Sequence, residues 1–144
     1  MFQHAIHAST RFALAALVSV AGIAATAIPV EPVQAAKAAS HKPFTLKAFR
    51  AAQAANKPIL IDVYAPWCPT CRAQQPGIAA AQHLKSNSGL VVFRMDFDNQ
   101  KTLLRQFRVT KQATLIAYRG KKETGRSLGV TNRAAIAKLI ATTR

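Results

Sequence analysis

The sequence predicts one α/β domain, and three observations support this. Apolar residues recur at helical spacing in some segments and form continuous runs of strand length in others. Two of these runs, 59–65 and 90–95, are typical of strands covered on both faces. The chain of 144 residues, half of them hydrophobic, suffices for one compact core and an additional N-terminal segment.

Residues 1–36 are predicted to be an export signal. A polar start ends at Arg11, an uncharged apolar run covers 12–28, and Pro29 breaks it. Small residues near Ala35 match the positions that a signal peptidase reads, so we expect cleavage there or one residue later. The protein is therefore expected to be periplasmic or otherwise exported.

An uncleaved anchor stays open as the alternative, because the apolar run is just short of the roughly 20 residues that span a bilayer. A mitochondrial presequence is disfavoured, since such segments are amphipathic and Arg-rich. After the signal we expect a short linker at 37–42 and the domain at 43–144.

The first elements of the domain are predicted from spacing and from residues that end a helix. Pro43–Thr45 is expected as a short edge strand, and 46–56 as a helix that Asn56 ends before Lys57-Pro58. The apolar run 59–65 is a buried strand. A turn at Trp67 leads into a helix to about Leu84, which Pro76 should kink.

The second half of the domain continues the alternation. We expect a strand at 90–95, a short helix at 99–107, strands at 114–118 and 124–129 joined by a turn at 119–123, and a last helix. Asn132 is expected to cap that helix, whose apolar stripe contains Ile136, Leu139 and Ile140.

The two cysteines of the chain, Cys68 and Cys71, lie three positions apart where a buried strand meets a helix. Cys68 would lie at the helix N-terminus, where free N–H groups and the helix dipole stabilise a thiolate that can attack a disulfide. Cys71, one turn further and more buried, would resolve the mixed disulfide. Pro69 suits the first helical turn because it has no N–H to lose.

Other interpretations of the cysteine pair are weaker. A disulfide across two residues closes too small a loop to constrain the unfolded chain much. Zinc needs about four ligands, and no second CxxC is present. A haem attachment needs His after the second cysteine, where the chain has Arg72. We therefore expect no metal and no cofactor, while a pair of inert buried thiols stays open.

A carboxylate, Asp62, interrupts the first buried strand six residues before Cys68. An unpaired buried charge would cost several kcal/mol, so this group should be paired or protonated. Arg94, which interrupts the second buried strand, is the predicted partner. Asp62 is then either one half of a structural ion pair or the group that takes the proton of Cys71.

Charge is the unusual feature of the composition. Lys and Arg number 20 against 5 Asp and Glu, for a formal charge of +15, and removing 1–35 takes away one residue of each sign. Such a surface attracts phosphate and anionic lipid. Because the basic residues are scattered, we expect a solvated basic surface and no specific nucleic acid.

Residues 43–144 resemble the thioredoxin family. The strand-borne acid, the Trp-Cys-x-x-Cys loop and the helix proline of that family are similar to Asp62, 67–71 and Pro76. Further matches are Arg94 in place of a lysine, the acidic stretch Asp96-Phe97-Asp98, and Gly129 before the last helix.

This resemblance implies a thioredoxin fold, which is a central mixed sheet flanked by helices on both sides. It also implies an enzyme that exchanges thiols and disulfides with proteins. Cys68, Cys71 and Asp62 would be catalytic, and Trp67 would border the substrate. Similar exported domains often receive electrons from a membrane donor, and the basic surface would favour contact with an anionic membrane.

Two departures from the family carry expectations of their own. The dipeptide between the cysteines is Pro69-Thr70, without the histidine of strongly oxidising periplasmic enzymes, which favours reductase or isomerase work. Where the family has a cis-proline, the chain has Gln112-Ala113. A cis bond before alanine costs about 2.5–4 kcal/mol, so we expect a trans bond and an altered substrate groove at these two residues.

The favoured hypothesis is thus thiol-disulfide exchange in exported proteins. The alternative is a non-catalytic basic module that uses the same scaffold to bind a membrane, nucleic acid or protein partner. The two hypotheses differ in whether the protein needs the Cys68 thiol for its function, because thiol-disulfide exchange requires it and binding does not.

Overall fold

The computed structural model describes residues 37–144. The predicted signal or anchor at 1–36 lies outside these residues. Within 37–144, no helix has the length and apolarity needed to cross a membrane.

Strands and helices alternate along the described chain, as predicted. In order, the elements are β1 (Lys42–Pro43), α1 (Leu46–Ala54), β2 (Pro58–Tyr64), α2 (Pro69–Gln82), a 3₁₀ turn η1 (Lys85–Asn87), β3 (Val91–Asp96), α3 (Lys101–Gln106), β4 (Thr114–Arg119), β5 (Lys122–Leu128) and α4 (Arg133–Ala141).

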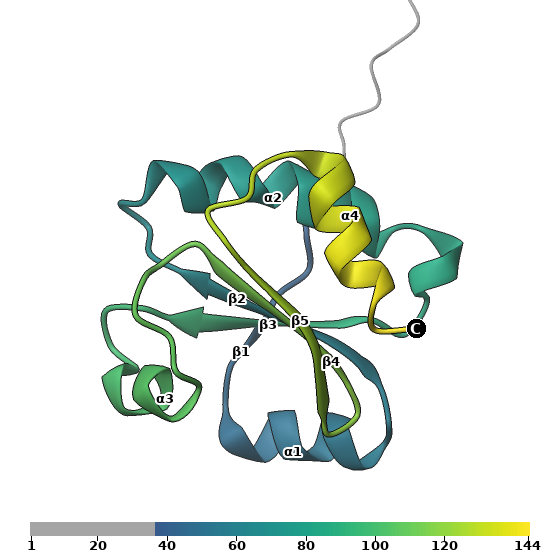
Figure 1. The fold of residues 1–144 in the computed structure, drawn as a ribbon, viewed down its shortest axis with the longest axis horizontal. Coiled ribbons are helices and arrows are strands. Elements are labelled where there is room, and N and C mark those ends of the chain that lie inside the picture. The colour runs from purple at the N-terminus through teal and green to yellow at the C-terminus, as the bar shows by residue number, and fades with distance from the viewer. Residues whose placement is uncertain (1–36) are drawn as a thin grey trace, which may run out of the picture. The chain divides into compact units, whose positions relative to one another are not determined.

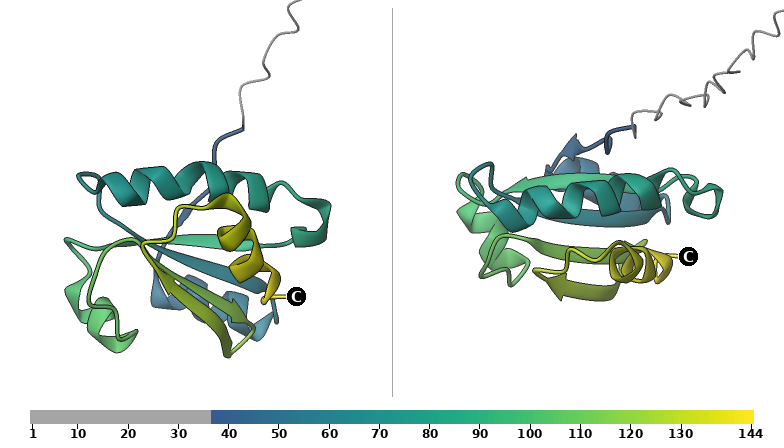
Figure 2. Two further views of the ribbon diagram at one scale, coloured as in Figure 1. Left: turned by 45° about the horizontal axis from the view of Figure 1, so that its top comes forward. Right: turned by 90° about the horizontal axis from the view of Figure 1, so that it is seen from above.

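One mixed sheet of five strands forms the centre, in the order β1-β3-β2-β4-β5 (Figure 1). The strand β3 pairs in parallel with both β1 and β2, whereas β4 pairs antiparallel with β2 and β5. Helices α2 and α4 cover one face and α1 and α3 the other, which the turned views also show (Figure 2). The predicted α/β class and thioredoxin fold are confirmed.

The side chains of β2 alternate between the two faces of the sheet and so contribute to two separate parts of the core. Ile59, Ile61 and Val63 pack on the α1 side, in a cluster rich in phenylalanine. Leu60 faces α2 and α4, where it belongs to a second cluster. Because side chains alternate along a strand, Asp62 points to the same side as Leu60, toward α2.

Side-chain caps decide where several helices begin. The Thr45 hydroxyl accepts a hydrogen bond from Ala48 N at 3.1 Å, so Thr45 caps α1 and is not part of the predicted edge strand. Asn132 caps α4 as predicted, accepting from Ala135 N at 3.1 Å. Asn56 follows α1 with φ +48°, a conformation that asparagine tolerates.

Two predicted bounds were too wide. The turn between β4 and β5 is tighter than 119–123, because Gly120, with φ +53°, lets two residues connect the strands. Helix α3 is shorter than 99–107, because the Asp96 carboxylate accepts from the backbone N–H groups of Asp98 and Asn99 at 2.8 and 3.0 Å and holds them in a turn.

The segment expected as a linker contacts the domain. Ser40 exchanges two hydrogen bonds with the Gln82 side chain, at 2.8 and 2.9 Å, and Lys42 lies in β1 opposite Phe93. Parallel pairing with β3 thus orders the chain before residue 43 and brings His41 to the sheet.

Candidate active site

The two cysteines lie at the first turn of α2 as free thiols. Cys68 is the N-cap residue, and its sulfur accepts a hydrogen bond from Cys71 N at 3.1 Å. Cys68 keeps 2% of its surface exposed and Cys71 none. The difference in burial has the predicted direction but is small.

Burial makes the Cys71 thiol a weak acid. It raises the pKa of Cys71 from 9.0 to about 11, and a hydrogen bond with the Cys68 side chain adds to the rise. The Cys71 sulfur lies 3.8 Å from the carbonyl oxygen of Val63, to which the thiol donates. At neutral pH Cys71 therefore carries its proton, and a nucleophilic Cys71 requires a proton acceptor.

Asp62 is fully buried and pairs with Arg94, as predicted. The two residues are directly opposite in the β2–β3 register, with Arg94 Nη2 3.3 Å from Asp62 Oδ2. The Arg94 guanidinium also lies over the ring of Tyr64, 4.0 Å from its centroid. The other carboxylate oxygen, Oδ1, is buried and has no hydrogen-bond partner among the described residues.

Two further side chains contact Asp62, and sequence reasoning missed both. Gln75 Nε2 donates to Asp62 Oδ2 at 3.2 Å and to the carbonyl oxygen of Cys71 at 2.9 Å, so it links the acid to the resolving cysteine. His41 Nε2 lies 3.3 Å from Asp62 Oδ2. The position of Gln75, four residues after Cys71 on one helix face, was a signal that could have found it.

Trp67 gives the site its exposed apolar surface. Its indole N–H donates to Asp98 Oδ2 at 2.9 Å, and its ring packs edge-on against Phe97 with centroids 6.5 Å apart. The side chain remains 55% exposed beside Cys68. Pro69 is exposed and Thr70 half-buried in the same loop. These positions suit a surface that contacts a protein substrate.

The loop before β4 borders the cysteines on the other side. No cis peptide bond occurs in 37–144, so the predicted trans bond between Gln112 and Ala113 is confirmed. Ala113 adopts φ +60°, and its N–H donates to the carbonyl oxygen of Val63 at 2.9 Å. The buried Gln74, which sequence reasoning missed, donates to the Ala113 carbonyl oxygen at 3.1 Å.

Ala113 packs directly in the cluster that holds Cys68 and Cys71. Gln112 beside it is half-buried. The structure thus packs Cys68, Cys71 and Ala113 in one cluster, and Gln75 links Asp62, which is paired with Arg94, to the backbone of Cys71. The other residues predicted for the site are chain neighbours of this cluster: Trp67, Pro69, Thr70 and Gln112.

A pocket of about 640 Å³ lies behind this site, between α2 and the segment that precedes β1. Its lining includes the Asp62 neighbours His41, Gln75 and Arg94, with apolar atoms from alanines and Pro76. It contains no acidic residue. Among the described residues, no group of three His, Cys, Asp or Glu is arranged to hold a metal ion.

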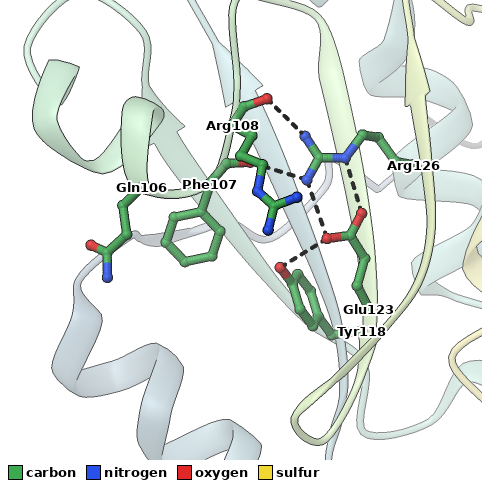
Figure 3. Close-up of a pocket in the computed structure, with 6 residues that line it drawn as sticks. All are labelled: Gln106, Phe107, Arg108, Tyr118, Glu123 and Arg126. Carbon is green, nitrogen blue, oxygen red and sulfur yellow. Dashed lines mark hydrogen bonds and ion pairs between the residues drawn. The ribbon is translucent and has the colours of Figure 1, made fainter.

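A second pocket, of about 580 Å³, lies on the α1 and α3 side of the sheet, away from the cysteines (Figure 3). There Glu123 accepts from Tyr118 Oη at 3.3 Å and from Arg126 Nε at 2.9 Å. The Arg126 guanidinium holds the pKa of Glu123 below its ordinary value, while burial raises the pKa of Tyr118 to about 12. Arg126 also donates to the carbonyls of Phe107 and Arg108, so this network joins β5 to the end of α3.

Known proteins with similar sequences and structures are thioredoxins. The thioredoxin family model matches residues 40–142. A thioredoxin H-type of Brassica campestris is 32% identical over 91 residues, which are 63% of this chain and 72% of that protein.

Two further similar proteins match this chain over very different shares of their own length. The bifunctional thioredoxin reductase/thioredoxin of Mycobacterium leprae (strain TN) is 30% identical over 88 residues, and the chain spans only 19% of its length. Among solved structures, the crystal structure of Trxlp from Edwardsiella tarda EIB202 is 42% identical, with a TM-score of 0.67, and the match covers 70% of this chain and 98% of that chain.

Proposed function

We propose that this chain, which belongs to the thioredoxin family and is a protein-disulfide oxidoreductase, reduces or isomerises disulfides of exported proteins. The observation that carries the proposal is the contrast between the sulfurs. Cys68 accepts a hydrogen bond from a backbone N–H at a helix N-terminus. The fully buried Cys71 keeps its proton, and Gln75 links its carbonyl oxygen to Asp62.

The first step uses Cys68. Its thiolate attacks one sulfur of a substrate disulfide, and the other substrate sulfur leaves as a thiolate. The result is a mixed disulfide between Cys68 and the substrate. The helix N-terminus favours the anionic form that starts this attack.

The second step uses Cys71 and Asp62. The Cys71 thiol transfers its proton to Asp62, directly or through water, and its sulfur attacks Cys68. The second substrate sulfur leaves, so two electrons have passed to the substrate and Cys68 and Cys71 are joined as a disulfide. Asp62, whose Oδ1 is buried and without a hydrogen-bond partner in the described structure, is the group that we assign to accept the proton. A membrane electron donor would then restore the thiols.

The direction of exchange is proposed from the dipeptide Pro69-Thr70. It places no imidazole beside the Cys68 thiolate, and a less stabilised thiolate makes the disulfide form less oxidising. We expect a reduction potential closer to about −270 mV, typical of reducing thioredoxins, than to about −120 mV, typical of the periplasmic oxidant. Equilibration with glutathione buffers measures this value.

Export is proposed from residues 1–36 alone. Expression of the full chain in a Gram-negative bacterium should yield a periplasmic product that begins at residue 36 or 37. Mass spectrometry of the fractionated protein measures the start. An intact chain in the membrane fraction would favour the anchor, and an intact chain in the cytosol would refute export.

The catalytic proposal is tested by insulin reduction with dithiothreitol, using native protein and Cys68→Ser. We expect the native protein to accelerate reduction and the variant to lose at least nine tenths of the acceleration. In parallel, Cys71→Ser should accumulate mixed disulfides through Cys68, whereas Cys68→Ser should accumulate none. Equal rates for native and Cys68→Ser would refute catalysis and favour the non-catalytic basic module.

A further inference from the structure

We propose that His41 takes the Cys71 proton from Asp62 and releases a proton to solvent. This inference rests on the proposed function, because it explains how Asp62 is discharged after it has accepted that proton. His41 acts through Asp62 and does not contact the sulfurs. Its role is therefore that of a relay and positioning residue.

The position of His41 indicates which ring nitrogen carries hydrogen. Nδ1 lies 3.2 Å from the carbonyl oxygen of Ala39, which can only accept, so Nδ1 is the donor there. Nε2 of the neutral ring is then an acceptor. It faces Asp62 Oδ2 at 3.3 Å, and an ionised carboxylate oxygen is also an acceptor.

Arg94 cannot satisfy both of these acceptors. Its Nη2 lies 3.2 Å from His41 Nε2 and 3.3 Å from Asp62 Oδ2. A guanidinium Nη carries two hydrogens, and Gln75 Oε1 takes one of them. Gln75 Nε2 donates to Asp62 Oδ2 at 3.2 Å, so each of the two acceptors has a donor available. Once Asp62 has taken up a proton, its carboxyl is itself a donor, and His41 Nε2 is an acceptor that faces it at 3.3 Å.

Only His41 among the contacts of Asp62 can pass a proton on. The Arg94 guanidinium stays protonated in proteins, and the Gln75 amide does not titrate. His41 is the one titratable uncharged ring within hydrogen-bond distance of the carboxylate in residues 37–144.

His41 also supplies the route to water. The Asp62 side chain is completely buried, whereas the His41 side chain is 11% exposed and lines the pocket of about 640 Å³. The titratable and charged groups around that pocket are His41 and Arg94 with Lys37, Arg72, His83 and Arg133, and none is acidic.

Cys71 gives its proton to Asp62, and the protonated carboxyl passes a proton to His41 Nε2. The imidazolium then releases a proton to water in the pocket, which returns Asp62 and His41 to their starting states. The sulfur of Cys71 attacks Cys68, and the departing substrate thiolate takes a proton from solvent.

The test is stopped-flow reaction of the reduced protein with a symmetrical nitroaromatic disulfide, whose two thiolates are released one after the other. The first release reports attack by Cys68 and the second reports resolution by Cys71. Both are measured from pH 5 to 9 in native protein, Asp62→Asn, His41→Gln and the matched control His83→Gln. His83 lines the same pocket but does not contact Asp62.

We expect His41→Gln to leave the first release within about twofold of native and to slow the second about tenfold at pH 7. Glutamine keeps a polar contact but cannot titrate. The pH at which resolution reaches half its maximum should therefore fall by about one unit or more, because a carboxylate alone takes up a proton at lower pH than an imidazole. His83→Gln should match native in both phases.

Free imidazole provides an independent readout. In His41→Ala, imidazole in the buffer should restore the second release several-fold, because the pocket leads to the vacated position, and it should not restore Asp62→Asn. The relay would be overturned if the resolution rate of His41→Gln fell by the same factor at every pH and imidazole did not rescue His41→Ala. His41 would then have only a structural role.

Failure of the relay and failure of the proposed function give different results. Slow resolution in Asp62→Asn with native resolution in His41→Gln would overturn the relay and leave Asp62 as acceptor. Native resolution in both Asp62→Asn and His41→Gln would overturn the assignment of Asp62 and the relay with it. Absence of a second release in native protein would overturn the function itself.

Discussion

Burial makes the thiol of Cys71 a weak acid. Cys68 lies at the N-cap with a backbone donor, whereas Cys71 lies one turn inside, next to the backbone of β2. The fold favours the neutral thiol of Cys71, because a thiolate there would be desolvated. The same preference couples the stability of the reduced protein to pH.

The reduced protein should lose stability as pH rises from about 9 to 11. The pKa of Cys71 is about 11 in the folded protein and about 9.0 when unperturbed. A raised pKa stabilises the folded state fully below the unfolded value, and this contribution disappears as pH rises through the folded value. Urea unfolding under reducing conditions should show a steeper loss in native protein than in Cys71→Ser, which has no thiol at this position. Parallel losses would contradict the assignment.

At the scale of elements, the loop before β4 is held by backbone contacts that a proline could not make. Ala113 has φ +60° and donates its N–H to Val63, and its carbonyl accepts from Gln74 and from Gly129 N. Proline requires φ near −65° and has no N–H. The replacement of the family's proline by alanine is therefore matched by a different loop conformation.

Ala113→Pro should lower the free energy of unfolding by about 3 kcal/mol, through the lost hydrogen bond and the incompatible φ. Urea denaturation of the reduced protein measures this. The matched control is Ala113→Gly, which keeps the N–H and adopts positive φ without steric cost, and it should remain within about 1 kcal/mol of native. A proline variant as stable as native would mean that the loop rearranges to accept the ring.

Helices α2 and α4 approach closely at Gly77. A Cβ at this position would lie 2.7 Å from Cδ1 of Ile136, which is fully buried, so that side chain would have to shift within a closely packed core. Gly77→Ala should therefore destabilise the fold by about 1–2 kcal/mol, although alanine is the better helix former.

The contact can be isolated with Ile136→Val, which removes the Cδ1 atom. In that background Gly77→Ala should cost at least about 1 kcal/mol less than in native protein, as a double-mutant cycle from urea unfolding would measure. Equal costs in the two backgrounds would show that the strain lies elsewhere, for instance against the Arg133 backbone at 3.5 Å.

At the scale of the whole molecule, the acidic residues of the described chain are few and take part in intramolecular hydrogen bonds. The four in the described chain are Asp62, Asp96, Asp98 and Glu123, and each accepts hydrogen bonds from a neighbouring side chain or backbone group. With 20 Lys and Arg against 5 Asp and Glu in the chain, most of the positive charge has no acidic counterpart. This supports the proposed contact with an anionic membrane.

The protein should bind vesicles that contain anionic phosphatidylglycerol and not vesicles of neutral phosphatidylcholine. Binding should weaken at least about tenfold between 50 and 200 mM salt, because screening shortens the range of attraction. Co-sedimentation with the chain that begins at Lys37 measures this without the apolar N-terminal segment. Salt-independent binding to both lipids would contradict an electrostatic surface.

Several features follow from the sequence alone because their causes are local. Apolar runs and helical spacing locate the elements to within two or three residues, and Asn132 marks the start of α4. The pairing of Asp62 with Arg94 could be predicted because each interrupts an apolar run and the two strands are neighbours. The cysteine pair could be placed at a strand-helix junction from the spacing of residues in the sequence alone.

Other features depend on contacts between distant segments. Arg94 Nη2 reaches His41 from 53 positions away, and Gln74 reaches the carbonyl of Ala113 across 39 positions. No periodicity encodes such contacts, since they depend on how β1 joins the sheet and where α2 lies on it. The φ of Ala113 is likewise imposed by the hydrogen bonds around it and not by alanine's own preference. The sequence therefore determined the reacting pair and its acid, whereas only packing decided which groups surround that acid and by which route its proton can leave.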